Sequence, residues 1–175
     1  NSVNQINNVC VGLSCGKNAI ATASENVFVG TESGFQNTAI NNFNETPKNG
    51  SRNVFLGFHC GRNNGQGYNN VFVGYKSGAS NSTGYCNTFV GYMSGRQRTT
   101  GNKNIMIGVS NKSTNKIGNN NIFIGNELDI LVTDSDYNLN IGNIIKGKLQ
   151  QNRKSLSIDL DGVGRVNVLG NLETN

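Results

Sequence analysis

The decapeptide NNVFVGYKSG at residues 69–78 has close copies 17 residues before and after it, RNVFLGFHCG at 52–61 and CNTFVGYMSG at 86–95. Each copy contains an anchor glycine that ends an Asn-x-x-x-Gly stretch. The anchors are Gly12, Gly30, Gly57, Gly74, Gly91, Gly108, Gly125 and Gly142. From Gly57 onward every interval is 17 residues, whereas the first two intervals are 18 and 27. A strict short period of this kind is typical of a solenoid, in which each repeat is one coil.

The residues before each anchor have the pattern of a short strand. An asparagine stands four positions before every anchor, where we expect it in a turn or in a ladder of stacked asparagines. The first and third residues of the following triplet are mostly Val, Ile or Leu, and period two places them on one face. We expect this face to fill the interior. The prediction is an all-β, parallel β-solenoid (β-roll) of about eight 17-residue coils.

The middle residue of the triplet is aromatic in most coils, and alternation places it on the opposite face, which we therefore expect to point outward. Stacked coils would align these residues in one apolar stripe. A stripe of that size is rarely left exposed, so we expect it to be buried between identical chains of a cyclic oligomer. A loop or the C-terminal part covering the stripe is the alternative. The predicted interface residues are Phe28, Phe55, Phe72, Phe89, Met106 and Phe123.

Composition and spacing divide the chain into two parts. Residues 1–126 are predicted to form the solenoid repeats, with a loop insertion at 41–50 that contains the only proline, Pro47. Residues 127–175 are predicted to form a last degenerate coil and a small C-terminal β module or cap, because segments 129–133, 154–160 and 164–169 alternate like strands. No apolar run approaches the roughly 20 residues of a membrane span, so we expect no membrane insertion.

Chemistry-bearing motifs are sparse in this sequence. The single histidine, His59, follows an anchor, and no Cys-x-x-Cys or histidine cluster indicates a metal site. We expect no metal, no cofactor, no catalytic residues and no nucleic-acid partner. The glycines mark coil corners, and none forms a phosphate-binding loop. The cysteines are Cys10, Cys15, Cys60 and Cys86, and we expect four free thiols because Cys15 and Cys60 lie two coils apart.

The middle coils are basic. No Asp or Glu occurs between Thr46 and Asn126, a stretch with nine Lys or Arg residues. The simple interpretation is that these charges keep the surface solvated. The more specific interpretation is that this surface binds an anionic glycan. Repeat alignment gives Arg62, Arg96, Lys76, Tyr75 and Tyr92 as candidate ligand-binding residues, with the tyrosines offering sugar rings an apolar face. Packing of these aromatics between coils or subunits is the alternative.

The segment NTFVGYMSG, together with TTGNKNIMIG up to residue 108, resembles the Asn-Thr-x-x-Gly-x-x-(Ala/Ser)-Gly repeat of viral and phage tail fibres. Such repeats are found upstream of endosialidase-type intramolecular chaperones, and they are similar to head repeats of trimeric autotransporter adhesins. The resemblance implies a homotrimer of parallel β-rolls in an attachment fibre on a virion or cell surface. Because catalytic motifs are missing from the sequence, we expect no enzymatic activity. A glycan-cleaving tailspike is the alternative, but it needs paired carboxylates that the basic coils lack. A hexapeptide-repeat acyltransferase is disfavoured by the 17-residue period.

Overall fold

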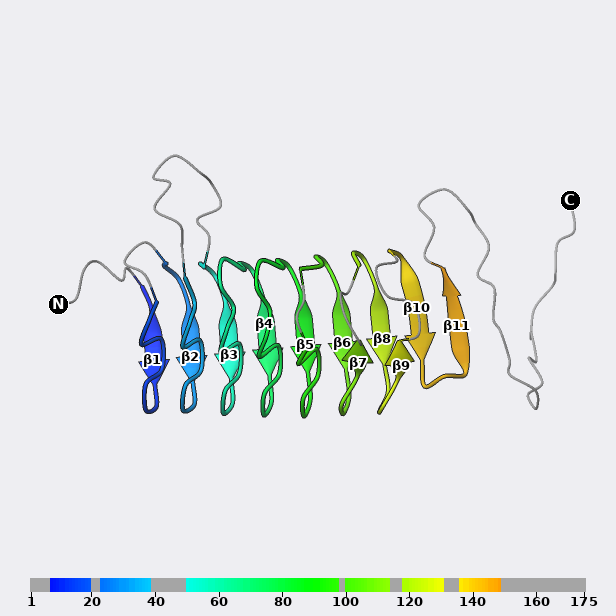
Figure 1. Ribbon diagram of the computed structural model, residues 1–175, viewed down its shortest axis with the longest axis horizontal. Coiled ribbons are helices and arrows are strands. Elements are labelled where there is room, and N and C mark those ends of the chain that lie inside the picture. The colour runs from blue at the N-terminus through cyan, green and yellow to red at the C-terminus, as the bar shows by residue number, and fades with distance from the viewer. Residues whose placement is uncertain are drawn as a thin grey trace, which may run out of the picture.

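The structure is a computed structural model that describes residues 7–19, 23–38, 50–97, 100–113, 118–130 and 136–148. These residues form an all-β rod whose strands stand side by side from the N-terminal to the C-terminal end (Figure 1). Eight strands are parallel members of one sheet: β1 (Val9–Val11), β2 (Val27–Val29), β3 (Val54–Leu56), β4 (Val71–Val73), β5 (Thr88–Val90), β6 (Ile105–Ile107), β8 (Ile122–Ile124) and β10 (Asn138–Ile141). The predicted parallel β-solenoid is confirmed.

The strands are in the register that the anchors predict, with each residue opposite its equivalent in the next coil. Phe55 is opposite Phe72, which is opposite Phe89. Backbone bonds continue outside the strands, as where Gly78 N donates to Ser94 O at 2.9 Å. The eight parallel strands belong to a solenoid of about six turns, fewer than the eight coils expected.

The aromatic residues lie inside the coils, so the prediction of an outward aromatic stripe is wrong. The six side chains are at most 3% exposed and form the core: Phe28, Phe55, Phe72, Phe89, Met106 and Phe123. Successive phenylalanine rings stack at centroid distances of 4.9–5.1 Å. Because these side chains are buried within their own chain, they cannot form the predicted trimer interface. The Val, Ile and Leu residues flanking them face outward instead.

Glycine makes room for the aromatic rings. The glycine four positions after the anchor faces the ring of its own coil, so a Cβ added to Gly61 would lie 2.5 Å from the Phe55 ring, and one added to Gly34 would lie 2.7 Å from the Phe28 ring. One ring therefore fills the width of a coil. The two aliphatic side chains of the same strand triplet would not fit inside together.

Asparagine shares the interior with the rings, because an Asn stands two residues before the inward-facing middle residue of each strand triplet. The side chain of Asn53 accepts a bond from Asn70 N at 3.0 Å, and Asn70 accepts one from Asn87 N at 2.9 Å. The amide of Asn70 also donates to Gly84 O at 2.8 Å. The predicted asparagine ladder exists, and it satisfies buried backbone groups along the rod.

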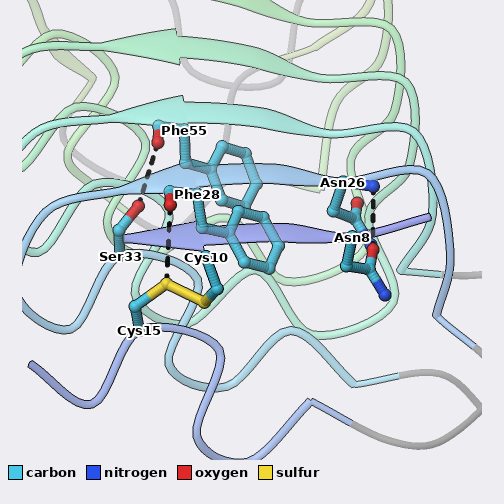
Figure 2. Close-up of a disulfide and its surroundings, with 7 residues drawn as sticks. All are labelled: Asn8, Cys10, Cys15, Asn26, Phe28, Ser33 and Phe55. Atoms are coloured by element: carbon cyan, nitrogen blue, oxygen red, sulfur yellow. Dashed lines mark hydrogen bonds between the residues drawn. A yellow bond between two sulfur atoms is a disulfide. The ribbon is translucent and has the colours of Figure 1, made fainter. Parts of the chain in front are cut away.

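The first coil replaces the aromatic ring with a disulfide. Cys10 occupies the inward position of β1, and it is bonded to Cys15 of the same coil, with the Cα atoms 5.8 Å apart. Figure 2 shows this bond beneath the stacked rings of Phe28 and Phe55. The prediction of four free thiols is wrong because it placed Cys10 outside; Cys60 and Cys86 are free.

The C-terminal part continues the sheet before reversing. β11 (Ile145–Lys148) pairs antiparallel with β10 and so covers its edge. β7 (Lys112–Ser113) and β9 (Asp129–Ile130) form a separate two-stranded parallel sheet. The division at 126/127 stays a prediction. Residues 41–49 of the expected loop insertion and the expected strands at 154–160 and 164–169 lie outside the described residues.

Candidate interaction surfaces

The outer face of the parallel sheet is almost entirely aliphatic. It consists of the first and third residues of the strand triplets, of which Thr88 alone is polar. These are Val9, Val11, Val27, Val29, Val54, Leu56, Val71, Val73, Thr88, Val90, Ile105, Ile107, Ile122, Ile124, Leu139 and Ile141. Val71 is 38% exposed, and Ile107 is 40% exposed. We call this surface the aliphatic face.

The size of the aliphatic face follows from the strand spacing. Eight strands about 4.8 Å apart span roughly 38 Å, and three residues of strand add a width of about 10 Å. The resulting patch of about 380 Å² is in the range where the largest apolar patch of a monomer is often functional. These columns were predictable from the sequence, but the prediction that they fill the interior is wrong.

A column of stacked aromatic side chains lies one residue beyond the anchors. The Phe58 and Tyr75 rings are 5.5 Å apart, and the Tyr75 and Tyr92 rings are 5.2 Å apart. Tyr75 and Tyr92 are 37% and 48% exposed. The Lys76 ammonium lies 5.1 Å from the centroid of the Tyr75 ring. The structure therefore brings three of the predicted ligand residues together. The aromatic rings also stack on one another, which agrees with the alternative prediction that they pack between coils.

Arg62 differs from Arg96 although both stand five positions after an anchor. Arg62 Nε is 2.6 Å from Glu32 Oε2, and its guanidinium lies 5.1 Å from the Phe35 ring. This hydrogen bond holds the pKa of Glu32 below its ordinary value. Among the described residues, no carboxylate lies within ion-pair distance of Arg96, whose Nη1 is 3.5 Å from Met93 Sδ.

Acids from the N-terminal coils also reach other basic residues of the middle coils. Arg52 Nε is 2.8 Å from Glu25 Oε2, and His59 Nε2 is 3.1 Å from Glu32 Oε2. Burial lowers the pKa of His59, while Glu32 opposes that shift. The positive charge available for a ligand is therefore concentrated at the later coils, and Arg62 is largely neutralised. The sequence alone predicted Arg62 and Arg96 equally as ligand-binding residues.

A recess opens where the stack of regular turns ends. It has a volume of about 300 Å³ and is lined by Tyr92, Met93, Arg96, Gln97, Ser110 and Asn111. Tyr92 and Arg96 were predicted from the sequence as ligand-binding residues, whereas the other four lining residues were not. The available signal was the loss of the Ser-Gly turn after Gly108, where Asn111 and Lys112 replace serine and glycine.

Features of other functional classes are sparse in the part of the chain that the structure describes. Within the described ranges, no three His, Cys, Asp or Glu side chains come together as a metal site. The same residues include no helix that is long and apolar enough to cross a membrane. Comparison of the chain with protein-family models, curated proteins and solved structures finds no match.

Proposed function

We propose that this chain is a structural and receptor-binding segment of a homotrimeric attachment fibre, displayed on a virion or an extracellular cell surface. The aliphatic face carries the proposal. A continuous apolar surface along a rod is self-complementary, so identical chains can pack against one another through this face. The number three comes from the resemblance to tail-fibre and adhesin repeats. The rod itself is suited to hold a binding surface at a fixed distance from its base.

Two further observations support a non-enzymatic role outside the cell. A disulfide between Cys10 and Cys15 is typical of oxidising compartments, which include the extracellular space. Glu25 and Glu32 each form an ion pair with an arginine, which favours a structural role for these carboxylates over that of the paired acid and nucleophile or base of glycoside hydrolysis.

The interface is tested by placing charge on the aliphatic face. Val71→Lys together with Ile105→Lys adds two ammonium groups to the face, and their long stems can still cover neighbouring apolar surface in a single chain. We expect light scattering to show dissociation to the single-chain mass, with an unchanged far-UV circular dichroism spectrum. The control is Ser80→Lys in a turn, which should leave the mass of the assembly unchanged.

Two results would contradict the assignment of the interface. The first is a doubly substituted protein that keeps the mass of the unaltered assembly, which would show that another surface joins the chains. The second is an equal loss of mass with Ser80→Lys, which would show that added charge in general, and not its position on the aliphatic face, separates the chains.

A further inference from the structure

The recess beyond the regular turns has a definite structural origin. In five coils, a glycine four positions after the anchor completes a tight turn: Gly16, Gly34, Gly61, Gly78 and Gly95. In the next coil Lys112 occupies that position, and the backbone there forms β7, which pairs with β9. The turn stack therefore ends at the coil of Gly95, and the recess forms at this step between two kinds of turn.

One wall of the recess is aromatic. Tyr92 is the last ring of the column, because Val109 holds the equivalent position in the next coil. One face of the Tyr92 ring packs on Tyr75 at 5.2 Å, and the side chain is 48% exposed. An aromatic ring held in place by a stacked neighbour offers a flat apolar surface at low entropic cost, with a hydroxyl group at its edge.

The polar groups of the recess suit a carboxylate on a hydroxylated ring. Arg96 supplies a planar fork of donors that matches a carboxylate. Ser110 and Gln97 supply neutral hydrogen-bonding groups. Asn111 is 2% exposed and held in place, since its amide donates to Ile107 O at 3.2 Å and its oxygen accepts from Leu128 N at 3.3 Å. Asn111 therefore forms a rigid part of the recess wall.

We propose that this recess binds a carboxylated pyranose, with the sugar ring against Tyr92 and the carboxylate on Arg96. The volume of about 300 Å³ is at the lower end of the range for small-molecule sites, which suits one sugar ring. The inference deepens the receptor-binding part of the proposed function by naming a ligand class and a position. Single sites of this kind are weak, and a multimeric fibre strengthens them through multivalency.

The probe for this site is trigalacturonate, with neutral trigalactose as the comparison, and the assay is ligand-observed NMR titration of the full chain. We expect saturable binding of trigalacturonate and at least tenfold weaker binding of trigalactose. Arg96→Gln and Tyr92→Ala should each weaken trigalacturonate binding about tenfold or more. Arg62→Gln is the matched control, and it should change binding less than twofold, because the Arg62 guanidinium is already engaged by Glu32.

Three results would overturn the proposal. They are no saturable binding of trigalacturonate at millimolar concentrations, equal loss with Arg62→Gln and Arg96→Gln, and equal binding of the neutral trisaccharide. The mass of each variant is measured by light scattering in the same buffer. Unchanged mass with absent binding would refute the ligand site and leave the fibre assignment intact, whereas a single-chain mass with intact binding would refute the assembly and leave the site.

Discussion

Replacing Phe72 by alanine removes one ring from the middle of the interior stack. The Phe72 ring lies 4.9 Å from the rings of both Phe55 and Phe89, and it is fully buried. Truncation of a buried phenylalanine costs about 3–5 kcal/mol, and a stacked aromatic pair is worth about 0.5–1.5 kcal/mol beyond its buried area. The truncation cost already contains part of the stacking energy, so the loss of two stacked pairs places the expected fall in the free energy of unfolding at the upper end of that range, about 4–5 kcal/mol.

The matched control is Phe58→Ala, the same change at a ring that is 42% exposed. Phe58 stacks on the outside, so its removal should cost about 1 kcal/mol. Urea unfolding followed by circular dichroism, at one fixed protein concentration, compares the two variants with the unaltered chain. Equal losses for the two variants would refute the interior position of Phe72. A Phe72→Ala protein with full stability and reduced assembly mass would favour an aromatic interface instead.

Other predictions concern the cysteines and the glycines. Cys86 is exposed and should react with a thiol reagent in the folded protein, whereas Cys60, whose pKa burial raises to about 12, should react only after unfolding. The unfolded thiol loses its proton near its ordinary pKa of 9.0, but the folded one does not until about 12. Stability should therefore fall as pH rises through this window, and Cys60→Ser should reduce that fall. Gly61→Ala should cost about 2–4 kcal/mol in urea unfolding, because of its positive φ and the nearby Phe55 ring. Reduction of the disulfide should increase amide hydrogen exchange in the first coil more than in the coil of Gly61.

The period of the sequence was sufficient to predict the sheet and its register. Parallel stacking requires equivalent residues to meet, so Phe55, Phe72 and Phe89 had to align whichever way they faced. Alternation separated the two faces but did not say which one was inside. The decision depends on volume, since one ring opposite a glycine fills a coil that cannot hold two branched side chains.

A signal for the inward direction was present in the sequence. Phe28, Phe55, Phe72 and Phe89 each have a glycine six residues later, and the coil of Met106 has lost both the phenylalanine and that glycine. A glycine at a fixed distance from a ring in four coils indicates contact across an interior, although Phe123 has Asp129 at that position and Cys10 has Gly16 there. The invariant asparagine two residues before the ring points the same way, because it shares the ring's face.

The electrostatic pairs were harder to predict. Glu32 and Arg62 are 30 residues apart in sequence, and the longer interval between Gly30 and Gly57 hides the fact that they belong to adjacent coils. Aligning coils by their anchors places the two side chains three positions apart on neighbouring turns. The recess beside Arg96 depends on where β7 leaves the turn stack; the 17-residue spacing is unchanged there, and only the replacement of Ser-Gly by Asn111 and Lys112 marks the change.

Sedimentation equilibrium of the unaltered chain tests the self-association of the aliphatic face most directly. The chain has a mass of 18.8 kDa. The proposed assembly predicts a single species of three times that mass, independent of loading concentration across the micromolar range. A folded, monodisperse species of 18.8 kDa at the same concentrations would contradict the account.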